Sequence, residues 1–484
     1  MSNLIKYLIV DCISYRVPPL LACLTLGLLL FGCASNSKEP DKVILTLTEE
    51  FSSVINTNKP KSIFVFMDGT TNNPNLPTNV YRTYKEILAN NDEQTIAIYL
   101  YGVGNTDNPI AGQAMAIGME HRTKQAYAFI IKHYMPGDHI YLFGFSRGAL
   151  SARSLAGLIS YAGIPKISEN EHDSEILLRI ANKIIELTKD VKDKDYKDAW
   201  KKWKPGDNPL LAKLILDEKI NKKVGRETQS AEVKFLGVWD TVPGSKFLMN
   251  EFFADTDLSC KEKLDWNKSL PIIKVISYKG MAKGERYKTD SYPAIRYIAH
   301  AVSNDEKRSM FRPLFLCSNT INSDSVINSS YTSLNETVFP GAHADVGGGY
   351  GIENNQLPAI SLNWMLSLLA DHYRFNSKPH KATEAYAKGL AHLSISDSAG
   401  NILSECRDRI LPKSISKDPS VKDREDAGLV PLFIFGQVTD NGNDERSCVQ
   451  CENPKEKIKQ ANIRCVEQKN IKCSYFIQQN WITK

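Results

Sequence analysis

The sequence has little net charge and only a short apolar run near its N-terminus. Its 60 basic and 55 acidic residues leave a net charge of +5. Such a small excess gives no electrostatic reason to expect a nucleic-acid partner, and it favours an anionic membrane surface only weakly. The apolar run, residues 20–31, is about 12 residues long, whereas a helix that spans a bilayer needs about 20. The run is therefore too short for a transmembrane helix.

The first 33 residues have the pattern of a bacterial export signal. Lys6 and Arg16 precede the apolar run, and its end, LFGC at residues 30–33, resembles a lipobox. In that kind of signal the cysteine carries lipid, so we expect lipid attachment at Cys33. A plain signal peptide or an uncleaved anchor is the alternative. The pattern predicts a lipid-anchored protein of the cell envelope that faces the periplasm or the cell surface.

Cysteine is scarce until the last part of the chain. Beyond Cys33 seven cysteines remain, and five of them lie in the last 80 residues. In an oxidising compartment such a cluster indicates disulfides, with one cysteine left over. A zinc site is the alternative because Cys448 and Cys451 have ligand spacing, but Cys465 and Cys473 do not. We therefore expect disulfides. The seven are Cys260, Cys317, Cys406, Cys448, Cys451, Cys465 and Cys473.

Apolar runs of strand length alternate with helical patterns through the first half of the chain. This alternation predicts an α/β fold, a mostly parallel sheet covered by helices on both faces. Residues 166–230 interrupt it with a charged stretch of helical periodicity, which predicts a helical insertion. The expected strands are residues 62–67, 95–101, 139–143 and 233–239, with a helix within 115–134.

The third of these strands leads into a candidate nucleophile. Residues 144–149 read GFSRGA, and residues 150–159 continue as a helical pattern. A Gly-x-Ser-x-Gly turn between a strand and a helix is a nucleophile elbow, which exposes a serine in strained geometry. The helix beyond it begins with outward N–H groups that favour an oxyanion. A tight turn without chemistry is the alternative, but the context favours Ser146 as the nucleophile.

A serine nucleophile requires a base and an acid, which follow it in chain order in this kind of hydrolase. His343 is our candidate base because it lies on a glycine-rich loop after a short apolar stretch. His300 lies in a run, residues 296–308, that we interpret as helical, so a packing role is expected for it. Asp240 ends an apolar strand and is our candidate acid, with Asp345 as the alternative.

Five segments in this order resemble one known family. They are FMDGTTN (66–72), GFSRGA (144–149), GVWDTV (237–242), AHAVSNDEKR (299–308) and HADVGGGY (343–350). The chain is similar, over roughly residues 60–375, to the α/β-hydrolase family of the type VI secretion phospholipase effectors. The resemblance implies a serine esterase or lipase that hydrolyses phospholipid acyl esters with a Ser–Asp–His triad and without a metal or other cofactor. It matches Ser146 to the nucleophile.

The backbone N–H groups of Arg147 and Gly69 are the expected oxyanion donors. Two alternatives remain open: an esterase for soluble substrates, and a non-catalytic envelope lipoprotein that keeps the fold to bind lipid or protein. The expected organisation is a signal (1–33), a tether (34–60), an α/β-hydrolase domain (61–395) with the helical insertion (166–230), and a Cys-rich C-terminal region (396–484).

Overall fold

The computed structural model of the chain describes residues 48–54, 56, 58–102, 117–190, 227–242, 295–306, 308, 311, 313–316, 332–350, 357–375, 392–393, 411, 415–426 and 434–435. The predicted signal with Cys33, the predicted disulfides and the alternative zinc site lie outside these residues. Within the described ranges, no helix has the length and hydropathy needed to cross a membrane.

One eight-stranded sheet forms the centre of the described structure, with the strand order β1-β3-β2-β4-β7-β8-β9-β11. All the strand pairs from β3 to β11 are parallel. The strands are β1 (Thr48–Ser52), β2 (Ser62–Met67), β3 (Thr95–Leu100), β4 (His139–Phe145), β7 (Val233–Trp239), β8 (Ile295–Ser303), β9 (Ser333–Phe339) and β11 (Ser416–Lys417). The prediction of a mostly parallel sheet is confirmed.

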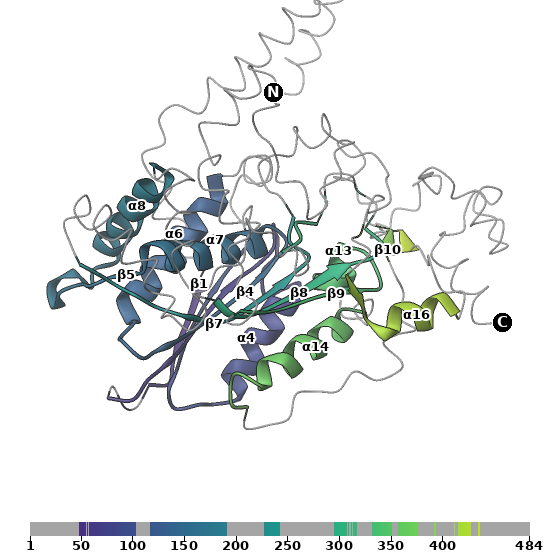
Figure 1. The fold of residues 1–484 in the computed structure, drawn as a ribbon, viewed down its shortest axis with the longest axis horizontal. Coiled ribbons are helices and arrows are strands. Elements are labelled where there is room, and N and C mark those ends of the chain that lie inside the picture. Colours follow the sequence, from purple (N-terminus) through teal and green to yellow (C-terminus); the bar gives the residue numbers. More distant parts are fainter. Residues whose placement is uncertain are drawn as a thin grey trace, which may run out of the picture. The chain divides into compact units, whose positions relative to one another are not determined.

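Helices cover both faces of this sheet (Figure 1). The helices α6 (Ile117–His133), α7 (Arg147–Ala162) and α8 (Ser174–Asp190) lie on one side, and α4 (Asn79–Ala89) and α14 (Pro358–Ala370) lie on the other. Two short helices, α13 (His343–Gly347) and α16 (Pro419–Asp426), follow β9 and β11. The predicted α/β layering is therefore confirmed.

The residues of β2 show why the expected strands are continuous apolar runs. Ile63, Val65 and Met67 belong to the core with α6, α7 and α8, whereas Phe64 and Phe66 belong to the core with α4 and α14. Successive side chains of a strand point to opposite faces, so a strand covered on both sides must be apolar at every position. This double burial places β2 in the middle of the sheet.

The predicted helical insertion begins and ends next to a short antiparallel pair of strands. Ile164 of β5 (Ile164–Pro165) pairs with Gln229 of β6 (Thr228–Gln229). The described part of the excursion includes α8, whose apolar face packs on the core with α6. The two ends of the insertion thus meet at one base outside the main sheet.

Three features differ from the expectations. Residues 296–308, interpreted as helical, contain β8, a strand buried along most of its length. Residues 48–52, inside the expected tether, form β1 beside β3. Residues 416–417, inside the expected C-terminal region, form β11 beside β9. The sheet thus extends at both edges beyond the predicted strands.

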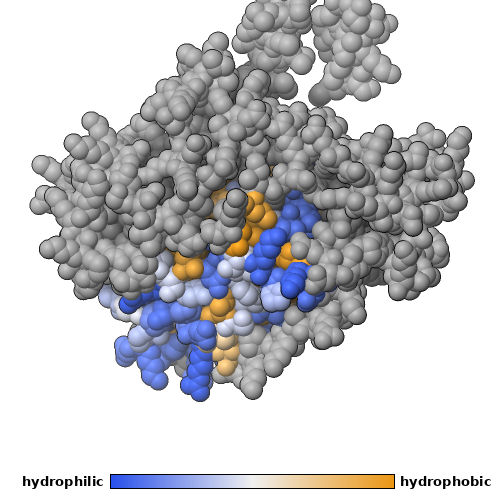
Figure 2. Space-filling model, turned by 45° about the vertical axis from the view of Figure 1, so that its right-hand side comes forward, coloured by the Kyte–Doolittle hydropathy of each residue, from blue (hydrophilic) through white to orange (hydrophobic). Residues whose placement is uncertain are grey.

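The described part of the face in Figure 2 is mainly hydrophilic, with hydrophobic residues in separate groups. Among the described residues, the large hydrophobic side chains that are exposed are Leu76 and Met135, at 41% and 52%. These two exposed side chains do not define a docking surface.

Candidate active site

The candidate nucleophile lies in a sharp turn between β4 and α7. Ser146 follows the last residue of β4 and has φ 57° and ψ −125°. A non-glycine residue with positive φ is strained and persists only where its surroundings hold it. The strand, the strained serine and the helix match the geometry of a nucleophile elbow.

The two glycines of GFSRGA allow the close contacts of this turn. A Cβ atom on Gly144 would lie 2.5 Å from the Gly148 oxygen, and one on Gly148 would lie 2.1 Å from the Met67 oxygen. Real Cβ atoms do not approach backbone atoms so closely. Both positions therefore require glycine, because α7 begins directly against the ends of β4 and β2.

The hydroxyl of Ser146 does not cap the helix that follows it. Ser146 is the N-cap of α7, but its side chain makes no capping hydrogen bond, and its backbone N–H donates to the Trp239 oxygen at 3.0 Å. A serine at this position commonly caps its helix. The backbone is thus tied to β7, while the hydroxyl is left for other chemistry. Arg147 occupies the first position of α7, where N–H groups point out of the helix.

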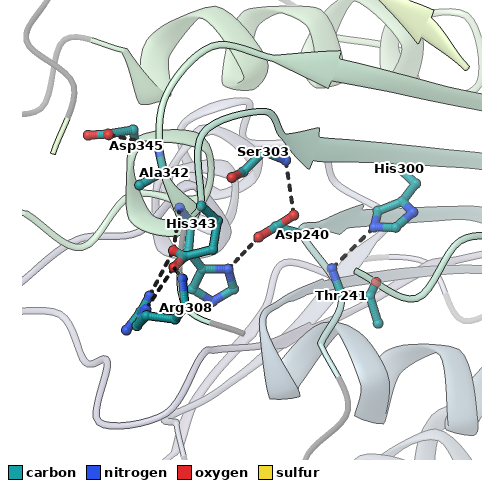
Figure 3. A network of polar contacts seen from close by, with 9 residues as sticks. Asp240, Thr241, His300, Ser303, Arg308, Ala342, His343 and Asp345 are labelled. Carbon is teal, nitrogen blue, oxygen red and sulfur yellow. Dashed lines mark hydrogen bonds and ion pairs between the residues drawn. The ribbon is translucent and has the colours of Figure 1, made fainter. Parts of the chain in front are cut away.

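The structure brings the candidate base and acid together (Figure 3). His343 begins α13 after β9, and Asp240 follows β7; the His343 Nδ1 atom lies 2.5 Å from the Asp240 Oδ2 atom. The other carboxylate oxygen, Oδ1, accepts the Ser303 N–H at 2.9 Å. Asp240 is fully buried, and His343 is 5% exposed. A buried carboxylate that accepts from Nδ1 holds an imidazole in the tautomer that a general base requires.

The surroundings of His343 keep its imidazole neutral. Burial lowers the pKa of His343 below its usual 6.5, although the hydrogen bond to Asp240 opposes this shift. The ring contacts Phe145 and Phe311, with centroid distances of 4.6 and 5.0 Å. Among the described residues Nε2 has no hydrogen-bond partner, so it makes no hydrogen bond with Ser146. With Nδ1 bound to Asp240, the lone pair of Nε2 can take a proton.

Asp345, the alternative acid, has another task. It is fully buried, and its Oδ2 accepts the Ala342 N–H at 2.9 Å. In Figure 3 its side chain points away from the His343 ring. Asp345 therefore stabilises the first turn of α13, the helix that carries the base, and the acid beside the imidazole is Asp240.

The backbone N–H of Gly69, one of the two expected oxyanion donors, is already hydrogen-bonded within the protein. Its N–H donates to the Asp68 Oδ1 atom at 2.7 Å, so in this structure it points to a carboxylate of the protein. Asp68 also accepts hydrogen bonds from Thr78 and Tyr99, and burial raises its pKa to about 6. A donor role for Gly69 thus requires that Asp68 release this N–H. A donor role for Arg147 remains a prediction.

Glu306, which the sequence alone does not single out, binds the backbone of the candidate base His343. Its Oε2 accepts the His343 N–H at 3.2 Å, and its Oε1 accepts the Arg308 backbone N–H and Nε at 2.8 and 2.9 Å. Arg308 in turn stacks over Phe311, 3.5 Å from the ring centroid. In the sequence, the only sign of this contact is that the segment 299–308 ends with acidic and basic residues. The contact of Glu306 with His343 becomes clear only in the folded structure.

These features define the class of the protein. The parallel sheet carries a strained serine between a strand and a helix, and a buried His–Asp pair follows later strands. This arrangement is typical of an α/β-hydrolase. The chain belongs to the family described as "T6SS, Phospholipase effector Tle1-like, catalytic domain", whose model matches residues 61–368. The recognised family resemblance is confirmed.

The chain is also similar to individual proteins. The chain is 24% identical over 274 residues to the uncharacterized protein YEL023C of Saccharomyces cerevisiae, a match of 52% of this chain and 32% of that protein. This chain thus spans about a third of the length of that relative. Two solved structures are similar, each 16% identical. An uncharacterized Pseudomonas aeruginosa protein has a TM-score of 0.35, with 64% of this chain and 46% of that chain covered. The Tle1 effector bound to the VgrG spike has a TM-score of 0.24, with 60% and 51% covered.

Proposed function

We propose that this protein cleaves acyl ester bonds of membrane phospholipids, as a phospholipase A does, through Ser146, His343 and Asp240. The observation that carries the proposal is the buried Asp240–His343 pair at 2.5 Å. The His343 ring contacts Phe145, the residue before the strained serine. The family match to phospholipase effector domains supports the substrate class.

The reaction follows from these three side chains. The Ser146 oxygen attacks the ester carbonyl while His343 Nε2 takes the hydroxyl proton, and Asp240 stabilises the resulting imidazolium without taking a proton. As the tetrahedral intermediate collapses, the imidazolium protonates the departing alcohol, which leaves an acyl-serine. Water then attacks this ester, with His343 again as the base, and the fatty acid is released. The Arg147 N–H is the proposed donor to the oxyanion.

The substrate class is tested by offering the purified full chain two kinds of ester. We expect release of fatty acid from vesicles of diacyl phospholipid, and labelling of the protein by a fluorophosphonate probe. Hydrolysis of short soluble esters without release from vesicles would instead identify a soluble-substrate esterase. Absence of both probe labelling and hydrolysis would favour the non-catalytic, lipid- or protein-binding alternative.

The activity should persist below pH 6.5. The pKa of His343 lies below 6.5, because burial disfavours the imidazolium. The base is neutral above this pKa and is lost as the pH falls through it. We therefore expect the acid limb of kcat/KM, which reports the free enzyme, to lie below pH 6.5. A titration of kcat/KM on a soluble ester measures it, and an acid limb above pH 6.5 would contradict the proposed environment of the base.

We also propose that Cys33 carries the lipid that holds the protein in the bacterial cell envelope. The support is the LFGC sequence at the end of a short apolar run. Each buried methylene of a lipid chain contributes about 0.8 kcal/mol, so two or three chains give stable anchoring.

Cys33→Ser should release the protein from membranes or leave its signal uncleaved, with no change in activity on soluble esters. Palmitate labelling of growing cells, followed by fractionation, measures the effect. If neither protein were labelled and both stayed on the membrane to the same extent, the lipid-anchor proposal would be wrong. The N-terminal segment would then be a simple signal anchor. Cys23→Ser, inside the apolar run, is the matched control and should keep the label.

A further inference from the structure

A second histidine–carboxylate pair lies behind the Asp240–His343 pair. The His300 Nδ1 atom on β8 is 2.9 Å from the Glu336 Oε1 atom on β9, and both residues are buried. Glu336 Oε1 also accepts the Leu316 N–H at 2.6 Å. Burial tends to raise the pKa of Glu336, but the hydrogen bonds from His300 and Leu316 lower it below its usual value. The carboxylate is thus ionised and held at a fixed place between two strands.

The other ring nitrogen of His300 points toward the site. The Thr241 backbone N–H donates to the His300 Nε2 atom at 3.1 Å (Figure 3). Because Nε2 accepts this bond, it carries no proton, and the proton of the neutral ring lies on Nδ1 toward Glu336. The ionised Glu336 therefore sets the tautomer that His300 needs in order to hold the Thr241 N–H.

That N–H belongs to the peptide that directly follows Asp240. Asp240 has φ 40°, so its backbone is strained and requires partners that fix it. The preceding peptide is held on both sides: the Trp239 oxygen accepts the Ser146 N–H, and the Asp240 N–H donates to the Ala301 oxygen at 2.7 Å. The following peptide is held by His300. Both peptides that set the dihedral angles of Asp240 are thus fixed by hydrogen bonds.

A further contact holds the chain immediately beyond this peptide. The Thr241 oxygen accepts the Leu314 N–H at 2.9 Å, and the Leu314 oxygen accepts from Arg153 Nη1 at 2.5 Å. Arg153 belongs to α7, the helix that begins at the nucleophile. The segment after the acid is therefore tied to β8 through His300 and, through Leu314, to the helix of the elbow.

We propose that His300, oriented by Glu336, is a positioning residue for the hydrolysis: it holds the strained backbone of Asp240 so that the carboxylate meets His343 Nδ1. The inference rests on the proposed function, in which Asp240 is the acid of the triad. His300 touches neither substrate nor His343 and acts through the Thr241 N–H alone. A displacement of catalytic groups by about 1 Å lowers turnover by about 100-fold.

Two substitutions separate the two bonds of His300. The amide oxygen of His300→Gln replaces Nε2 and can accept the Thr241 N–H, whereas the amide nitrogen of His300→Asn replaces Nδ1 and can donate only to Glu336. We expect His300→Asn to lower kcat by about 100-fold with little change in KM, and His300→Gln to stay within about tenfold of the wild type. Thermal unfolding of both variants is the control for folding, since each loses one buried hydrogen bond. Equal kcat values, or a lower value for Gln, would overturn the proposal.

The same substitution in an Asp240→Asn background tests whether His300 acts through the acid. Once the acid is disabled, His300→Asn should lower kcat by less than about threefold, because residues that act as a unit do not have additive effects. A loss of equal size in both backgrounds would mean a general structural defect. If neither variant folds, nitrogen-15 shifts of the wild-type imidazoles decide the question. We expect two buried rings, His300 and His343, protonated on Nδ1, and a single such ring would overturn the proposal.

These results are separate from a failure of the proposed function. If Ser146→Ala kept wild-type activity, the triad itself would be wrong. If Ser146→Ala were inactive while the two His300 variants had equal kcat, only the role of His300 would be lost.

Discussion

Ser146→Ala should lower kcat by about a millionfold and abolish labelling by a fluorophosphonate, while the protein stays folded. The hydroxyl makes no hydrogen bond to its helix, and its removal leaves the backbone bond from the Ser146 N–H to β7 intact. The small rate that remains comes from substrate binding and oxyanion donors. Fatty-acid release from phospholipid vesicles and thermal unfolding together measure the two parts of this prediction.

Ser154→Ala is the matched control on the same helix. The Ser154 hydroxyl donates to the Leu150 oxygen at 2.9 Å within α7, away from the turn. This variant should keep its activity and its probe labelling. Activity of Ser146→Ala near that of Ser154→Ala would exclude Ser146 as the nucleophile.

Asp240→Asn should lower kcat by about four orders of magnitude, since an amide in this place favours the wrong tautomer of His343. The carboxylate contacts His343 Nδ1 through one oxygen and the Ser303 N–H through the other, so an amide must lose one of these bonds. Steady-state kinetics on a soluble ester, with circular dichroism as a check of folding, measures the effect.

Asp345→Asn is the corresponding control, because asparagine keeps an oxygen that can accept the Ala342 N–H. Its expected effect is on the stability of α13, about 1 kcal/mol or less, with kcat within about tenfold of the wild type. If Asp345→Asn had the larger effect on kcat, Asp345 would be the acid and Asp240 a structural cap of β7.

The central strands were predictable from sequence because of their double burial. Residues 62–67 and 233–239 are apolar runs, and they form β2 and β7 with those bounds. At the edges of the sheet this signal weakens, since an edge strand has fewer neighbours to bury it. β1 therefore lies unrecognised in the expected tether, and β11 in the C-terminal region.

The error at residues 296–308 has a specific cause. β8 contains His300 and Arg296 within an otherwise apolar stretch, and such interruptions suggest the polar face of a helix. In the structure His300 is buried, because Glu336 and the Thr241 N–H satisfy both ring nitrogens. Glu336 lies 36 residues away from His300 in sequence, so local periodicity cannot reveal that partner.

Chain order and strand ends predict where the residues of the candidate site lie. Ser146 and Asp240 each follow a buried strand, and His343 follows β9, so parallel strands bring them to one edge of the sheet. What depends on three-dimensional contact was not predictable. Glu306 accepts the His343 N–H although the two residues are 37 positions apart, so no spacing rule relates them. Gly69 directly follows Asp68, but the sequence does not show that the aspartate side chain turns back onto this N–H.

The positive φ angles at Ser146 and Asp240 have an evolutionary consequence. Each such residue destabilises the folded state by about 1–3 kcal/mol, whereas glycine adopts these angles readily. A descendant that no longer needed catalysis would therefore gain stability by mutation to glycine at position 146, where the hydroxyl does not cap α7. At position 240 the loss of the buried hydrogen bonds from His343 and Ser303 offsets this gain. Glycine at position 146 of a relative would accordingly indicate, from its sequence alone, that the relative is no longer an enzyme.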